Sequence, residues 1–340
     1  MNISIAIATY NRSRELDLTL SSLERVDFSG GGEFEILVID NNSTDDTSGV
    51  AERFSSGFGG RLRYIREVRQ GLSHARNRAI AESQYEIVAF LDDDVDVNVT
   101  WFQNLAAVYR EGNYAAVGGR AFLVYPKARP AWLGERDEGL LTKVELGPDR
   151  RAAEPDELYG VNVSMRKEWV GRVGGFRTDL GRVGNRLWGS EETELLARVV
   201  EAGGELLYEP TAVVGHRVPS ERLRRAWFWS RCYWGLQSEA RILRDSEVTF
   251  YALARAGWWS LLACGGTVRA AVSNGPRSEE FFHHSKVLAG RCGFLLGLSG
   301  RFLQRRSLQD AISARAARFR QERTPTMPNT GSPNDLKIST

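Results

Sequence analysis

The chain has 340 residues, 42% of them hydrophobic and 26% charged, which is the composition of a globular protein large enough for one or two domains. Its longest uncharged stretch, residues 257–268, is too short to cross a bilayer, and the N-terminus begins a strand without the basic leader of a signal peptide. Three widely spaced cysteines lack metal-ligand spacing, so we expect reduced thiols and a cytoplasmic protein.

Strands and helices alternate over the first hundred residues. Strands are predicted at 2–9, 35–40, 61–66 and 85–91, with helices after the first three of them. The run Ser43–Asp46 predicts a capping box that opens the second helix, and Gly71 is a turn into the third. This alternation predicts a largely parallel, doubly wound sheet.

The strand at 85–91 is followed by four acids within five positions, Asp92, Asp93, Asp94 and Asp96. Carboxylates this close repel one another unless a cation is bound, and Mg²⁺ prefers carboxylate and phosphate oxygens. Asp40 ends a neighbouring strand, so it should lie at the same sheet edge, where open α/β sheets bind ligands. We therefore predict a metal–diphosphate site at Asp92 and Asp94, with Arg76 close enough to contact phosphate. A solvated acidic turn is the alternative.

The rest of the chain is predicted, in order, as a helix at 101–109, a strand at 115–122, a loop or lid at 125–158, a strand at 159–165, a loop at 174–189, a helix from 191, and strands at 205–208 and 211–214. Ser190 is expected to cap the helix that begins with Glu191 and Glu192, and the helix dipole favours both as anions. From residue 221 onward the chain is expected to be helical.

Charge is distributed unevenly along the chain. Residues 1–220 carry 26 Lys and Arg against 34 Asp and Glu, whereas residues 221–320 carry 17 against 7. A basic, tryptophan-rich segment is typical of contact with an anionic surface, here the inner face of the cell membrane. Ordinary core packing and solvated helix faces explain the same pattern, so both interpretations stay open.

Eight segments, in matching order and spacing, resemble the family 2 glycosyltransferases of the GT-A fold. They are Ala8–Arg12, Val38–Asp45, Ala75–Asn77, Phe90–Asp94, Gly160–Ser164, Val173–Phe176, Gly189–Leu195 and Val214–His216. The resemblance implies an α/β, Rossmann-like, mostly parallel sheet with flanking helices, followed by a C-terminal helical region. The expected division is a glycosyltransferase domain at 1–220, a basic helical region at 221–322 and a disordered tail at 323–340.

The resemblance also implies the reaction. A sugar would move from a nucleoside diphosphate sugar, with UDP- or dTDP-sugars expected, to an acceptor hydroxyl, with inversion at the anomeric carbon. Mg²⁺ or Mn²⁺ would stabilise the charge that builds up on the departing diphosphate. The expected acceptor is a glycan, a lipid-linked saccharide or a glycosylated metabolite, as in polysaccharide biosynthesis, and no nucleic acid is expected as a partner.

Roles for single residues follow from the same resemblance. The donor-binding residues would be Thr9, Tyr10, Arg12, Asp40, Asn42, Arg76, Asp92 and Asp93, and the metal ligands Asp94, Asp92 and His216. Thr9 and Asp40 would hold the nucleobase, and Asp92 would serve the ribose or the metal. Glu192 stands where the family has its general base, with Glu191 as the substitute, because the usual Glu-Asp pair is Glu-Glu here.

Two other functions stay open on the sequence. A phosphatase or phosphotransferase of the haloacid dehalogenase type also places Asp-x-Asp after a strand, although its motif is expected near the first strand. A non-catalytic nucleotide-sugar-binding subunit is the second alternative, and the intact acids Asp92, Asp94 and Glu192 argue against it. An EF-hand loop starting at Asp92 is excluded, because its sixth position is Val97 and its twelfth is Gln103.

Overall fold

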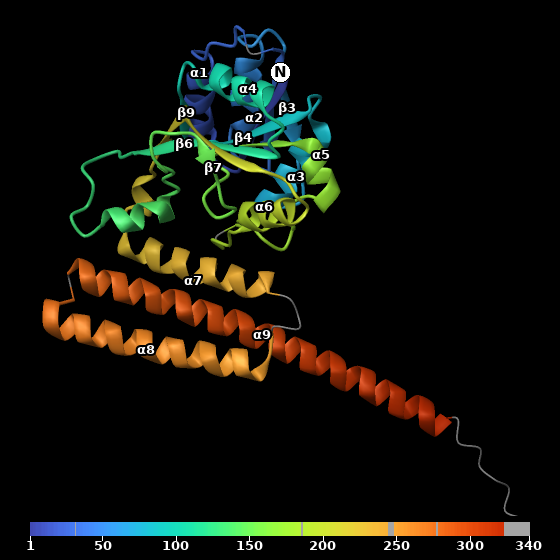
Figure 1. Cartoon of the computed structure of the whole chain (residues 1–340), viewed down its shortest axis with the longest axis vertical. Helices are drawn as coiled ribbons and strands as arrows, with labels where there is room; N and C mark the ends of the chain where they lie inside the picture. The colour runs from blue at the N-terminus through green and yellow to red at the C-terminus, as the bar shows by residue number, and fades with distance from the viewer. Residues whose placement is uncertain (31, 185, 244–247, 277, 323–340) are drawn as a thin grey trace, which may run out of the picture.

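The computed structural model describes residues 1–30, 32–184, 186–243, 248–276 and 278–322, and side chains of the last helix up to residue 301. The predicted disordered tail, 323–340, lies outside the described residues. A sheet with flanking helices is followed by three long helices, α7 (Arg225–Ile242), α8 (Phe250–Asn274) and α9 (Glu279–Glu322) (Figure 1). No helix within the described segments combines the length and apolar character needed to cross a membrane.

Nine strands of the described chain form one sheet, in the spatial order β3-β2-β1-β4-β8-β6-β9-β5, with β7 paired to β9. They are β1 (Ile3–Thr9), β2 (Phe34–Asp40), β3 (Leu62–Arg66), β4 (Ile87–Asp92), β5 (Val95–Val97), β6 (Ala116–Val124), β7 (Arg151–Ala152), β8 (Asn162–Arg166) and β9 (Leu206–Arg217). The strands β3, β2, β1 and β4 are parallel, as predicted. The rest of the sheet is mixed, because β8 runs against both of its neighbours while β6 and β9 are parallel.

The central strands are buried on both faces. In β1, Ile3, Ile5 and Ile7 contribute to the core on one face and Ala6 to the core on the other, as the alternation of side chains along a strand requires. Strands of this kind read in sequence as continuous apolar runs. Burial of each such isoleucine side chain contributes about 1.5–3 kcal/mol to folding.

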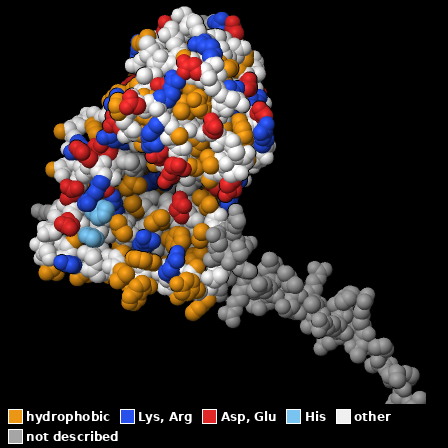
Figure 2. Space-filling view, viewed as in Figure 1, with side chains coloured by type: hydrophobic (Ala, Val, Ile, Leu, Met, Phe, Trp, Pro, Cys, Tyr) orange, Lys and Arg blue, Asp and Glu red, His pale blue; other side chains and the backbone are white. Residues whose placement is uncertain are grey.

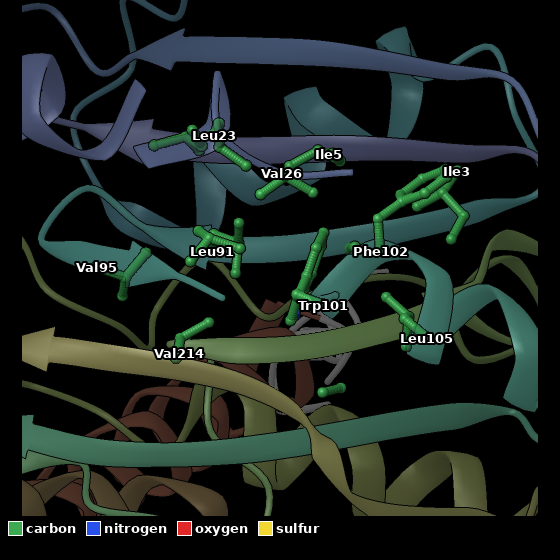
Figure 3. Close-up of a cluster of buried hydrophobic side chains, with 14 of the residues drawn as sticks. Ile3, Ile5, Leu23, Val26, Leu91, Val95, Trp101, Phe102, Leu105 and Val214 are labelled. Carbon is green, nitrogen blue, oxygen red and sulfur yellow. The ribbon is translucent and has the colours of Figure 1, made fainter. Parts of the chain in front are cut away.

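Helices cover both faces of the sheet. Their bounds are α1 (Ser13–Leu23), α2 (Thr47–Ser55), α3 (Leu72–Glu82), α4 (Trp101–Glu111), α5 (Lys167–Val173) and α6 (Glu191–Glu201). On one face, Leu23 of α1 and Trp101 and Phe102 of α4 close the core (Figure 3). On the opposite face, α3 and α6 pack through Ala75 and Leu195. The short helix α5 was not anticipated from the sequence.

The segment between β6 and β8, expected to be a loop or lid, carries a 3₁₀ helix, η1 (Glu135–Leu141), and the strand β7. A buried ion pair between Asp137 and Lys286 fastens η1 to α9. Leu141 packs in one apolar cluster with Phe228 of α7 and Phe282 of α9. Long-range contacts to the C-terminal helices therefore order a stretch that lacks periodicity of its own.

Two further local predictions are wrong. The two strands predicted at 205–208 and 211–214 are one strand, β9, which begins at Leu206 and whose pairing with β6 shifts register next to Gly119. Helix α2 begins at Thr47 without a side-chain cap. Asp45 instead accepts the backbone N–H groups of Ser13, at 2.9 Å, and Thr47, at 3.2 Å, so it ties the α1 and α2 loops together.

Candidate active site

The strands β1, β2 and β4 end together, because Thr9 is in register with Asp40 and Ala8 with Asp92. This confirms that Asp40 and Asp92 lie along one edge of the sheet. A cavity of about 310 Å³ lies at that edge. Its walls come from the ends of β1 and β4, the start of α3, the segment leading into α6, and the helix α7.

The predicted residues divide into two groups around this cavity. Those that line it are Thr9, Tyr10, Arg12, Arg76, Asp92, Asp93, Glu191 and Glu192, whereas Asp40, Asn42, Asp94 and His216 are not among its lining residues. The carboxylate of Asp40 is buried and accepts the Tyr64 hydroxyl at 2.6 Å and the Ser43 N–H at 2.8 Å. Asn42, at a left-handed φ of 67°, accepts a hydrogen bond from Arg66. Both residues brace the loop after β2.

Several lining residues were not predicted, namely Asn41, Gln70, Tyr159, Arg182, Trp188, Arg222 and Arg231. Asn41 accepts the Gly71 N–H at 2.7 Å and donates to the Arg69 carbonyl at 2.7 Å, so it joins the end of β2 to the start of α3. Its place next to Asp40 in the recognised motif was an available signal. Arg231 has no such signal, because it reaches the cavity from α7.

One guanidinium group holds two of the three acids that follow β4. Arg12 contacts Asp93 at 2.9 Å and Asp94 at 2.8 Å. Burial raises the pKa of Asp93 to about 6, although the Arg12 charge opposes this. Burial acts in the same direction on Asp94, but the contacts with His216, Arg12 and Arg222 hold its pKa well below the ordinary value. Asp94 is therefore a carboxylate throughout the neutral range.

Asp94 and His216 form the part of the site suited to a metal ion. The His216 Nδ1 lies 2.8 Å from the Leu141 carbonyl, which can only accept, so Nδ1 carries the hydrogen. The other ring nitrogen, Nε2, lies 3.3 Å from Arg222 Nη1 and 3.3 Å from Asp94 Oδ1, a buried oxygen without a hydrogen-bond partner in the described structure. A proton on Nε2 lowers the pKa of Asp94, and a metal ion would take the place of that proton.

The predicted metal ligands do not come together as a set of three. Among the described residues, no group of three or more His, Cys, Asp and Glu side chains is arranged to hold a metal ion. Asp92 lies apart from the Asp94–His216 pair and faces Arg76, with its Oδ1 3.9 Å from Arg76 Nη2. The protein thus offers two close ligands, and Mg²⁺ characteristically takes one or two from the protein and the rest from phosphate and water.

Glu191 and Glu192, the pair predicted to contain the general base, lie on the other side of Arg76. Arg76 Nη1 is 2.8 Å from Glu191 and 3.7 Å from Glu192. Burial, and then the negative charge of Glu192, raise the pKa of Glu191 to about 7. Burial also opposes ionisation of Glu192, but Arg76 and backbone N–H groups, that of Gly160 among them, lower its pKa. Glu192 is the more accessible side chain, 13% exposed against 4%, so the ionised carboxylate is the one that faces the cavity.

Ser190 does not cap α6, contrary to the prediction. It has a left-handed φ of 65°, and its hydroxyl donates instead to Glu239 of α7 at 2.8 Å. The Gly189 N–H donates to Ser238 at 3.1 Å, so α7 fixes the segment that leads into the Glu191–Glu192 pair. The serine side chain therefore bonds to a helix that is distant in sequence and not to the helix that follows it.

Comparisons with known proteins bear on this site. Residues 4–174 match the family model described as Glycosyl transferase family 2. The succinoglycan biosynthesis protein ExoM of Rhizobium meliloti is 27% identical over 306 residues, which is 88% of this chain and 94% of that protein. The glucosyl-dolichyl phosphate glucuronosyltransferase of Haloferax volcanii is 24% identical over 236 residues, 69% of this chain and 75% of that protein.

Two solved structures show the same fold. The mannosyltransferase PcManGT from Pyrobaculum calidifontis, in complex with GDP-Man and Mn²⁺, has a TM-score of 0.52 at 19% identity, covering 93% of this chain and 79% of that chain. S. aureus TarS 1–349 in complex with UDP-GlcNAc has a TM-score of 0.53 at 15% identity, covering 86% of this chain and 90% of that chain.

Proposed function

The chain belongs to glycosyl transferase family 2, and we propose that it transfers a sugar from a nucleoside diphosphate sugar to an acceptor hydroxyl with inversion at the anomeric carbon. One observation carries this proposal: the acids that end β4 and the Glu191–Glu192 pair that opens α6 line one cavity, with Arg76 between them. The family match favours this reaction over the Asp-x-Asp phosphotransferase considered from the sequence. Solved relatives in complex with GDP-Man and Mn²⁺ and with UDP-GlcNAc support a nucleotide-sugar donor.

Asp94 and His216 are the residues that would hold Mg²⁺ or Mn²⁺. Two neighbouring ligands, each about 2.1 Å from an octahedral ion, lie about 3 Å apart. The 3.3 Å between Asp94 Oδ1 and His216 Nε2 fits this spacing. A bound ion would supply positive charge against the developing negative charge of the leaving diphosphate.

The donor nucleotide is proposed to lie along the ends of β1 and β4. Tyr10 and Asp92 are partly exposed there and are placed to contact base and ribose. Thr9 donates to Asp93 at 2.7 Å, so its role is to position the acids, as is that of Arg12. Asp40 and Asn42 would act on the nucleobase through the loop that they brace. A UDP- or dTDP-sugar stays the expected donor.

Glu192 is proposed as the general base. In a single displacement, the acceptor oxygen forms a bond to the anomeric carbon as the bond to the diphosphate oxygen breaks, and the acceptor proton passes to the Glu192 carboxylate. Glu191 holds Arg76 from the buried side, at 2.8 Å, and Arg76 keeps Glu192 ionised. The Glu-Glu pair thus divides into a positioning residue and a base.

The helix α8 supports the predicted contact with an anionic membrane. Its exposed apolar side chains are Phe250, Tyr251, Trp258, Trp259, Leu261, Leu262, Val268 and Val272. They recur at three- and four-residue spacing along one face, and hydrophobic side chains gather over this side of the helical region (Figure 2). The helix has no acidic residue and exposes Arg255 and Arg269, a composition that suits a helix lying in the lipid interface.

The test is a calorimetric titration of UDP, GDP and dTDP into the protein, with Mn²⁺ and then with a chelator. We expect one of the three to bind in a metal-dependent way, and Asp94→Ala to lose the metal-dependent part. Asp96→Ala is the matched control, since Asp96 pairs with Arg217 outside the cavity. Binding that is unaffected by both the chelator and Asp94→Ala would refute the site.

A further inference from the structure

Besides Arg12 and Arg76, three arginines from separate segments line the cavity. Arg182 lies in the segment that leads to α6, Arg222 lies just after β9, and Arg231 lies on α7. Like charges gathered in a half-buried site repel one another unless anions offset them. Burial and then the charge of Arg182 lower the pKa of both other arginines, that of Arg222 to about 10. Arg182 therefore lies within electrostatic reach of both.

Acidic side chains of the described chain pair with only one of these three arginines. Arg222 contacts Asp94 at 3.4 Å. Neither Arg182 nor Arg231 forms an ion pair with any side chain that the structure describes. Arg231 donates to the Leu187 carbonyl at 3.1 Å, and its buried Nε has no hydrogen-bond partner in the described structure. Two guanidinium groups on the cavity wall are thus available to an anion.

The arginines lie at different ends of the reaction path. Arg222 touches both Asp94 and His216, so it lies at the proposed metal–diphosphate end. Arg231 lies at the other end, beside Gly189, where an added Cβ would come within 2.8 Å of its Nη1. The negative charges of Glu191 and Glu192 act on Arg231 as well, which places it near the proposed base.

We propose that Arg231, assisted by Arg182, binds an oxyanion group carried by the acceptor, either a phosphate or a carboxylate. This inference rests on the proposed function. In an inverting displacement the acceptor and the leaving diphosphate lie on opposite sides of the anomeric carbon. A cation next to the base is therefore on the acceptor's side, and it selects an acidic acceptor over a neutral one.

The experiment uses the full chain with Mn²⁺ and whichever nucleoside diphosphate binds. Three methyl glucosides are titrated into this complex: the neutral sugar, its 6-phosphate and the corresponding glucuronide. Tighter binding of an anionic probe than of the neutral one is expected, and the two anionic arms distinguish phosphate from carboxylate. In Arg231→Met this preference should fall by about 10- to 100-fold, the effect of one charge-assisted hydrogen bond.

Two variants and one control separate the outcomes. Arg231→Lys should retain most of the preference, and Arg25→Met, an exposed arginine just after α1 and outside the cavity, should retain all of it. Equal affinity for the neutral and anionic probes, or no binding of any probe, overturns this inference. The proposed function is tested separately, because it depends on metal-dependent binding of the nucleoside diphosphate. Loss of nucleoside diphosphate affinity in Arg231→Met also overturns it, since the arginine would then serve the donor.

Discussion

Asp94 Oδ1 and His216 Nε2 lie 3.3 Å apart in the interior of the protein, and Asp94 Oδ1 has no hydrogen-bond partner in the described structure. The backbone sets up this relationship from two directions. Asp94 follows β4, and the Leu141 carbonyl of η1 holds the hydrogen of His216 on the far side of the ring, at 2.8 Å. Such an outer contact fixes the tautomer of a metal-binding histidine.

Replacement of His216 by leucine should weaken Mn²⁺ binding by about 10- to 100-fold, because the ion loses one of two protein ligands. The measurement is Mn²⁺ titration by electron paramagnetic resonance in the presence of the bound nucleoside diphosphate. His284→Leu, on α9 and away from the cavity, should bind Mn²⁺ like the parent protein. Unchanged Mn²⁺ affinity in His216→Leu would remove His216 from the ligand set.

Glu191 should make the stability of the protein depend on pH. Its pKa is raised to about 7 in the fold, so the folded state binds a proton that the unfolded state has released above pH 4.5. The stabilisation is complete at low pH and is lost as pH rises towards 7. Of the charged groups that face this carboxyl group, ionised Glu192 raises its pKa and Arg76 lowers it.

The comparison is urea unfolding of the parent protein and Glu191→Gln at pH 5 and pH 8. From pH 5 to pH 8, the unfolding free energy of the parent protein should fall by about 1–3 kcal/mol relative to that of the variant. A difference that is independent of pH would mean that Glu191 is ionised throughout, like Glu192.

The ion pair between Asp137 and Lys286 should be essential for stability, because both side chains are buried and join η1 to α9. Lys286→Met leaves the Asp137 charge unpaired and should lower the unfolding free energy by about 3–5 kcal/mol. The double variant with Asp137→Leu should recover part of the loss. In urea unfolding, the exposed Lys127→Met should change stability by less than about 0.5 kcal/mol.

The exposed face of α8 should bind vesicles that contain anionic lipid. Flotation should weaken as salt rises, because the attraction is screened over roughly 10 Å at about 0.1 M salt. Replacing Trp258 and Trp259 together by serine should reduce flotation further. Val68 is an exposed apolar residue in the loop after β3, and Val68→Ser should leave flotation unchanged. Absence of flotation at low salt would leave α8 with an ordinary solvated or partner-covered face.

The sequence was informative where the signal is local. The acids after β4 follow a buried strand directly, so their place at the sheet edge could be predicted together with that of Asp40. Glu191 and Glu192 were likewise placed at the start of a helix, where the structure has them. Each of these positions is set by its own element.

Predictions failed where a partner distant in sequence decides the outcome. The Ser190 hydroxyl donates a hydrogen bond to Glu239 of α7 instead of capping its own helix, and Asp45 accepts the Ser13 N–H from a neighbouring loop. Arg231 could not be assigned to the cavity from sequence, because α7 reads as one more aromatic helix until its packing is known. The division predicted at residue 220 stays a prediction, although α7 supplies part of the cavity wall.

The most direct measurement is turnover of the bound nucleotide sugar by Glu192→Gln, followed as release of nucleoside diphosphate with saturating Mn²⁺. Glutamine keeps the size of the side chain but cannot accept the acceptor's proton. Turnover should fall by about 10²–10⁴-fold while donor affinity stays unchanged. Near-normal turnover in Glu192→Gln, with the large loss in Glu191→Gln or in neither variant, would contradict the assignment of Glu192 as the base.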